Sequence, residues 1–215
     1  MTLSLENRPG VDVETVGDRV RRFYGLDGKL SPLPAEWDQN FALDCGERKY
    51  VVKIANRDHA DDVLEMQNAA LDRLATRWKS GLTPVVVTSR DGAGMVEVDD
   101  GSGTLYRMRI LTWLPGSPLA TAGDVCPRGL VAIGEALGEL DRILVDFEHP
   151  GMKRDLVWDL ENAQWISAST RRIADADRRA IVERLLLQYR GRIVPLLDDL
   201  PHSVIHNDAN DENIL

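Results

Sequence analysis

The chain has 215 residues, of which 43% are hydrophobic and 28% charged, a composition that is ordinary for a globular protein. Its net charge of −9 argues against a nucleic-acid partner, because binding to a polyanion relies on basic patches. No apolar run approaches the roughly 18 residues of a membrane span, so no membrane partner is expected.

The two cysteines, Cys45 and Cys126, have no close partner in the sequence and no metal-ligand spacing. Two reduced thiols in a reducing compartment are a simpler interpretation than a disulfide. The first eight residues lack the basic-then-apolar order of a signal peptide. Together these features predict a cytoplasmic location.

The first predicted element is a helix over residues 13–23, where apolar residues recur at helical spacing and Gly25 follows as a stop signal. The prolines within 32–34 predict a loop rather than regular structure. Residues 41–43 and 50–54 then read as two strands joined by a short polar hairpin turn.

A second helix follows, with Asp58 as its expected N-cap and a broad apolar face that extends to Leu74. Three further strands are expected: one over 85–87, and a hairpin formed by 94–98 and 105–110. The first half is therefore expected to be rich in β-structure.

The segment 114–118 contains two prolines and a glycine and breaks this pattern. Helices are expected afterwards, over about 124–144, in short pieces around 158–165, and over about 176–197, where Pro195 should bend or end the helix. No internal repeat is present.

This order of elements predicts an α+β fold with two lobes: a β-rich lobe over 1–114 and a helical lobe over 115–215. A cleft between two such lobes is a usual place for a small-molecule site.

The last ten residues contain the pattern His-x-Asp-x-x-x-x-Asn, formed by His206, Asp208 and Asn213, directly after an apolar run. In protein-kinase-type phosphoryl transfer, a loop of this spacing places an Asp that accepts the proton of a hydroxyl and an Asn that holds Mg²⁺. Two other interpretations are a polar surface turn and a calcium-binding loop. The calcium loop is disfavoured because it requires glycine at the sixth position, where Asn213 stands.

Lys53 lies inside an otherwise apolar strand, and lysine rarely points into a core unless it is paired. Taken alone, it would be interpreted as an outward-facing lysine on a half-exposed strand. The helix that follows and the downstream motif favour a different role, in which a strand lysine binds nucleotide phosphates and a helix residue steadies it.

Two weaker signals accompany Lys53. A polar segment before the first strand pair is expected to arch over a nucleotide, although it lacks the glycines of a phosphate loop: Asp38, Gln39 and Asn40. A segment at the break between the halves is expected to offer backbone groups to an adenine edge: Thr112, Trp113 and Leu114.

With these residues in place, the chain resembles the aminoglycoside phosphotransferase and choline kinase superfamily, small-molecule relatives of protein kinases. The resemblance is strongest over Tyr50–Asn56, Leu111–Gly116 and His206–Asn213. Asp38–Phe41 and His206–Asp211 are similar to the hydroxylysine-kinase-like branch, which includes N-terminal sections of fusion proteins with a class III aminotransferase downstream.

The resemblance implies ATP and Mg²⁺ as cofactors. It implies that Lys53 binds the α- and β-phosphates, that Asp208 is the catalytic base, that Asn213 binds magnesium and that His206 braces the loop. The family's helix glutamate falls on Gln67, whose side-chain oxygen could hydrogen-bond Lys53 at lower strength than a charged group, and the sequence leaves open whether Gln67 supports Lys53 in this way.

These features predict an ATP-dependent phosphotransferase that acts on a hydroxyl of a small, cationic amino-alcohol or amino acid, of hydroxylysine, choline, ethanolamine or aminoglycoside type. A second metal-binding Asp segment is absent, so the helical lobe is expected to be truncated and the chain alone inactive. The alternatives are a nucleotide-sensing pseudokinase and a binding module within a larger aminotransferase fusion protein.

Overall fold

The computed structural model of the chain describes residues 4–78, 81–152 and 156–215. Residues 1–3, part of the N-terminal segment considered above, lie outside the described residues. The chain forms two compact units, one containing residues 4–152 and 203–215 and the other residues 156–202. Every helix in the described ranges is too short or too polar to cross a lipid bilayer.

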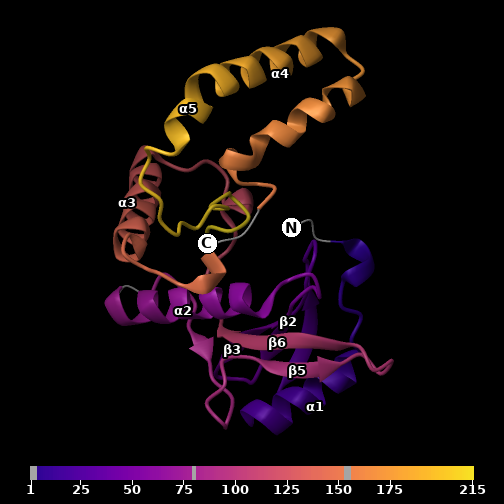
Figure 1. Ribbon diagram of the computed structural model, residues 1–215. Helices are drawn as coiled ribbons and strands as arrows, with labels where there is room; N and C mark the ends of the chain where they lie inside the picture. The colour runs from indigo at the N-terminus through magenta and orange to yellow at the C-terminus, as the bar shows by residue number, and fades with distance from the viewer. Residues whose placement is uncertain (1–3, 79–80, 153–155) are drawn as a thin grey trace. The chain divides into compact units, whose positions relative to one another are not determined.

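The first unit is built on a six-stranded antiparallel sheet whose main path runs β1-β2-β3-β6-β4, with β5 paired to β6 (Figure 1). The alternating burial along its central strands follows the two-residue period of β-structure. The strands are β1 (Lys29–Leu33), β2 (Gln39–Asp44), β3 (Lys49–Ile54), β4 (Val86–Val87), β5 (Val96–Asp99) and β6 (Leu105–Thr112).

One face of the sheet packs against α1 (Val13–Tyr24) and forms the larger apolar core. The side chain of Asp12 caps this helix by accepting a hydrogen bond from Thr15 N, and Gly25 ends it at a positive φ of 67°, which glycine adopts without strain. The central strands send every second residue into this core: Phe41, Leu43, Val52, Ile54, Met108 and Ile110.

The other face of the sheet is covered by α2 (Asp61–Arg77), as Figure 1 shows. A second apolar core forms where α2 meets α3 (Pro127–Leu144), and Val204 packs against it. Because Val204 packs against this core, the segment that follows it is tied to the same unit as the sheet. Short 3₁₀ turns complete the unit: η1 (Leu5–Asn7), η2 (Leu119–Thr121) and η3 (Pro150–Met152).

The second unit is helical: η4 (Leu160–Ala168), η5 (Thr170–Arg172), α4 (Ala176–Gln188), a π-helical turn η6 (Tyr189–Ile193) and α5 (Val194–Leu197). The hydroxyl of Tyr189 donates to the carbonyl oxygen of Leu160 at 2.6 Å and so links η6 to η4. The helix expected over 176–197 is interrupted at η6, because Pro195 has no N–H to continue the α-helical hydrogen bonds.

The loop expected over 32–34 is wrong, since Pro32 lies within β1 opposite Phe41 of β2. Because β1 is an edge strand, a missing N–H on its open side costs no sheet hydrogen bond. The cap expected at Asp58 is also wrong: α2 begins after Ala60, without a side-chain cap. The Asp58 carboxylate instead accepts hydrogen bonds, each of 2.7 Å, from Ser4 N and Asn7 Nδ2.

The domain boundary expected after Leu114 remains a prediction. Residues 115–152, including α3, form one compact unit with the sheet. The division between the two compact units therefore does not fall at the expected lobe boundary.

Candidate active site

Three polar residues lie side by side across the α2-covered face of the sheet. Asn40 of β2 pairs with Lys53 of β3, and Lys53 pairs with Arg109 of β6. Their neighbours along each strand point into the core under α1, so alternation turns these three side chains to the opposite face. We call Asn40, Lys53 and Arg109 the polar row.

Lys53 is turned inward, with only 25% of its side chain exposed, and its Nζ lies 3.8 Å from Oδ2 of Asp38. Burial lowers the pKa of Lys53, and the positive charge of Arg109 lowers it further, whereas the nearby Asp38 carboxylate opposes both effects. Lys53 is therefore not the outward-facing lysine of the simpler interpretation.

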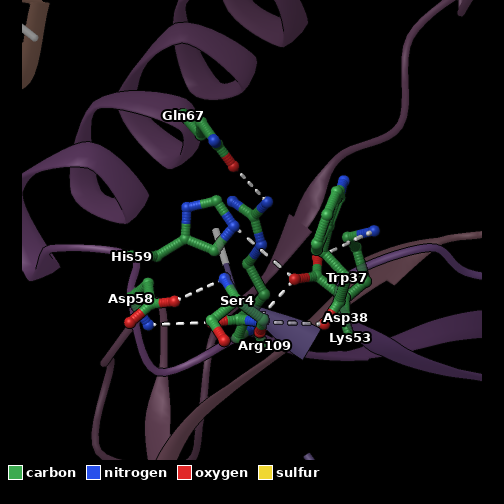
Figure 2. A network of polar contacts seen from close by, with 9 residues as sticks. Ser4, Trp37, Asp38, Lys53, Asp58, His59, Gln67 and Arg109 are labelled. Carbon is green, nitrogen blue, oxygen red and sulfur yellow. Dashed lines mark hydrogen bonds and ion pairs between the residues drawn. The ribbon is translucent and has the colours of Figure 1, made fainter. Parts of the chain in front are cut away.

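Asp38 connects the loop before β2 to the segment between β3 and α2 (Figure 2). Its Oδ1 accepts a hydrogen bond of 3.0 Å from Asn56 N and lies 3.6 Å from Nε2 of His59. Burial by itself raises the pKa of Asp38, but His59, Lys53 and the Asn56 N–H together outweigh burial and lower it. Asp38 therefore remains a carboxylate that pairs with Lys53.

Gln67 does not take the partner that the sequence suggests. Its Oε1 accepts a hydrogen bond of 2.5 Å from Nη2 of Arg109, as Figure 2 shows. The next residue on α2, Asn68, accepts a hydrogen bond of 2.8 Å from Nη1 of the same arginine. Gln67 thus contacts Arg109, and Lys53 is paired with Asp38.

Arg109 is the polar-row residue that sequence reasoning missed. It is only 9% exposed, although arginine is among the residues least often buried. The available signal was the one used for Lys53, a cation within an apolar strand. Pairing of the two strands was needed to show that Arg109 stands beside Lys53.

Gln39 and Asn40 differ in their surroundings, although both were expected to arch over a nucleotide. Both ends of the Gln39 amide are bound to Val11, with Oε1 accepting from Val11 N at 3.0 Å and Nε2 donating to its carbonyl at 2.8 Å. These two hydrogen bonds fasten the segment before α1 to β2. Asn40 and Asp38 lie near Lys53, whereas Gln39 is committed to Val11.

The expected adenine-reading segment already uses two of its N–H groups within the fold. Thr112 N donates to Val85 O at 2.9 Å, and Trp113 N donates to Lys49 O at 3.2 Å. Any recognition of an adenine edge by this segment would therefore rely on carbonyl groups or on Leu114.

The last ten residues form a hydrogen-bonded loop centred on Asp208. Asn213 Nδ2 donates to Oδ2 of Asp208 at 2.8 Å and to its carbonyl oxygen at 2.9 Å, and Asn210 Nδ2 donates to Oδ1 at 2.9 Å. His206 Nδ1 accepts a hydrogen bond of 3.3 Å from Asp208 N. Asn207 has a φ of 60°, a conformation that asparagine tolerates better than most residues. The motif therefore brings Asp208, Asn213 and His206 together.

The loop is attached to the segment that follows the expected hinge. Leu119 N donates to Ile214 O at 2.8 Å, and Ala120 N donates to Asp211 O at 2.9 Å. Together with the packing of Val204 against the core between α2 and α3, these bonds hold the loop within the compact unit that also contains Lys53.

Comparison with known proteins identifies the family of the chain. Residues 29–215 match the phosphotransferase enzyme family. The chain is 29% identical to hydroxylysine kinase of Mus musculus, covering 87% of this chain and 54% of the relative. It is also 29% identical to hydroxylysine kinase of Danio rerio, covering 98% and 61% respectively. The chain thus spans little more than half the length of these relatives.

Among solved structures, amicoumacin kinase hAmiN in complex with AMP-PNP and Ca²⁺ has the same fold, with a TM-score of 0.63 at 15% identity. The match covers 85% of this chain and 54% of that one. It confirms the predicted α+β, kinase-like fold class. Because the family match extends over most of the sequence, the chain belongs to the phosphotransferase enzyme family.

Proposed function

We propose that this chain carries the nucleotide-binding sheet and the catalytic loop of an ATP-dependent small-molecule kinase. The observation that carries the proposal is the pair of hydrogen bonds from Asn213 to Asp208, which holds an amide oxygen beside a carboxylate in one loop. This is the arrangement needed to place a base next to a metal ligand. Membership of the phosphotransferase family supports the same chemistry.

The residues fit a nucleotide with its magnesium ion. Asn40 Oδ1 is buried without a hydrogen-bond partner among the described residues, beside Lys53, where a donor such as a metal-bound water would satisfy it. Nδ2 of Asn213 is engaged with Asp208, which leaves Oδ1 as a hard oxygen ligand. Mg²⁺ usually takes one or two protein oxygens together with phosphates and waters, so this small donor set suffices.

Bound MgATP would supply the phosphoryl group and neutralise part of its charge. Lys53 would hold the α- and β-phosphates, with Asp38 fixing the position of its amine. Asp208 would orient the acceptor hydroxyl and take its proton, and Asn213 would hold Mg²⁺. His206 would brace the loop through the Asp208 N–H. Catalysis of this kind depends on positioning and electrostatic stabilisation.

We further propose a small amino-alcohol or hydroxylated amino acid as the acceptor. The named relatives are hydroxylysine kinases, and a net charge of −9 suits a cationic substrate. An aminotransferase section in the same polypeptide remains a prediction from sequence.

The test has a binding step and a turnover step. Calorimetry on this chain should show ATP binding that depends on Mg²⁺, and absence of such binding would contradict the proposal. In a protein that contains this chain and releases ADP in the presence of hydroxylysine, Asp208→Asn should reduce turnover by about 10³-fold or more while ATP binding persists. Asp211→Asn removes another carboxylate from the same loop and should retain most of the activity.

A second candidate is nucleotide binding without phosphoryl transfer. It is favoured by Gln67, which carries a neutral amide that hydrogen-bonds Arg109, so that α2 supplies no charged partner to Lys53 through this residue. Magnesium-dependent ATP binding combined with no transfer to any hydroxyl acceptor, in a protein containing this chain, would favour it.

A further inference from the structure

The polar row places two cations next to each other under α2. Lys53 and Arg109 are directly opposite on neighbouring strands, and both are largely buried. The two hydrogen-bond acceptors recorded for the Arg109 guanidinium, Gln67 Oε1 and Asn68 Oδ1, are neutral. Within the described ranges, the carboxylate recorded against this pair is Asp38, which lies 3.8 Å from Lys53.

This arrangement leaves an excess of buried positive charge. Buried charges are normally paired with opposite charges, because removing an ion from water is unfavourable. One carboxylate cannot balance two cations, and burial lowers the pKa of Arg109 while the more distant Asp38 opposes that shift. An anionic ligand would supply the missing negative charge.

We infer that Arg109 is a second phosphate-binding cation, which holds the nucleotide phosphates together with Lys53 while Gln67 and Asn68 orient its guanidinium. The inference rests on the proposed nucleotide-binding function and extends it to a residue outside the sequence motifs. The guanidinium has five N–H donors, of which the bonds to α2 account for two, so donors remain for phosphate oxygens.

The same arrangement explains why a glutamine is suitable at position 67. A glutamate there would form an ion pair with Arg109 and cancel the charge that attracts phosphate. The neutral amide fixes the direction of the guanidinium and leaves its charge available. Asp38, from the loop before β2, then provides the carboxylate for Lys53.

The first experiment compares Arg109→Gln with Arg107→Gln in the full 215-residue chain, using calorimetry with MgATP and competition by adenosine. Arg107 is a matched control, since it lies two residues earlier on the same face of β6 and pairs with Asp61 and Glu97. Arg109→Gln should weaken MgATP binding about ten- to a hundredfold and adenosine binding less than about threefold. Arg107→Gln should leave both unchanged.

Equal losses for MgATP and adenosine would mean that Arg109 only supports the fold, and would overturn the inference. So would an unchanged affinity for MgATP in Arg109→Gln. Absence of MgATP binding by the unmodified chain would instead overturn the proposed function, and the inference with it. The two failures are therefore distinguishable.

A second variant, Gln67→Glu, covers the case in which Arg109→Gln does not fold. The new carboxylate should pair with Arg109 and weaken MgATP binding by about threefold or more, with adenosine unaffected. If Gln67 acted instead as a weak substitute for a glutamate that supports Lys53, Gln67→Glu would strengthen MgATP binding. Unchanged or tighter binding would overturn the inference.

Discussion

The ion pair between Asp38 and Lys53 should make the stability of the sheet sensitive to acid. Because the contacts of Asp38 lower its pKa on folding, this carboxylate titrates below the unfolded value of about 3.9. The native state then binds fewer protons than the unfolded state. The contribution of Asp38 is therefore present above the unfolded pKa and is lost as the pH falls through the folded pKa.

Asp38→Asn should reduce the free energy of unfolding at pH 7 by about 1–3 kcal/mol, since a buried cation loses its charged partner. It should also flatten the fall in stability below about pH 4. Urea denaturation between pH 3 and 7 measures both effects. Asp91→Asn, at an exposed position, should change stability by less than about 0.5 kcal/mol. A variant whose acid slope equals that of the unmodified chain would exclude this role for Asp38.

Asn207 allows a second test at the level of a single residue. Its φ of 60° places the residue before Asp208 in the left-handed region. Asn207→Ala should cost about 1 kcal/mol in unfolding free energy, whereas Asn207→Gly should be close to neutral because glycine adopts this conformation freely. Equal losses in the two variants, measured by urea denaturation, would show that the conformation imposes no such cost.

The residues of the candidate site differ in how well the sequence alone could identify them. Asp208 and Asn213 were predicted from a short pattern with known chemistry, and Lys53 from its place as a cation within an apolar strand followed by a helix and by that pattern. Arg109 belongs to no such pattern, and its importance depends on strand pairing and on two acceptors about 40 residues earlier in the chain. The partner of Gln67 was left open by the sequence for the same reason, since helix periodicity gives a face but not the residue opposite it.

At the scale of elements, the strands and helices with strong periodicity were predicted, whereas the first strand and the start of α2 were not. Pro32 argued against a strand, but the penalty for proline disappears at the edge of a sheet, and edge position is a property of the assembled fold. Aspartate is a common N-cap residue, but the carboxylate of Asp58 accepts hydrogen bonds from Ser4 and Asn7 of the N-terminal segment instead of capping α2.

The contact between η3 and α2 gives an element-scale prediction. A Cβ built on Gly151 would lie 2.2 Å from the carbonyl oxygen of Asp62, a backbone atom that cannot move without shifting α2. Gly151→Ala should therefore lower the free energy of unfolding by about 1–3 kcal/mol through overpacking. Thermal and urea denaturation would measure the loss.

Gly134 provides the matched control, because it lies within α3 and a Cβ there would meet nothing within 4 Å. Gly134→Ala should raise stability by up to about 1 kcal/mol through higher helix propensity. If both alanine variants were stabilising, the close approach of Gly151 to α2 would not exist in solution.

At the scale of the whole molecule, the residues proposed to bind MgATP all belong to one of the two compact units. The polar row lies on the sheet, and the Asp208 loop is held by Val204 and by bonds to residues 119–120. A ligand that bridges the sheet and this loop should stabilise that unit by about 2.7 kcal/mol at a concentration of 100 times Kd.

Hydrogen exchange with and without MgATP would locate this stabilisation. Peptides from 39–54, 105–112 and 204–215 should exchange more slowly when MgATP is bound, because opening of these segments requires release of the ligand. Peptides from α4 should change little, since its unit contributes none of the proposed ligands. Lys53→Met should abolish the protection by removing a phosphate contact. Protection confined to α4 would place the nucleotide elsewhere and contradict the assignment of Lys53 and Asp208 to one site.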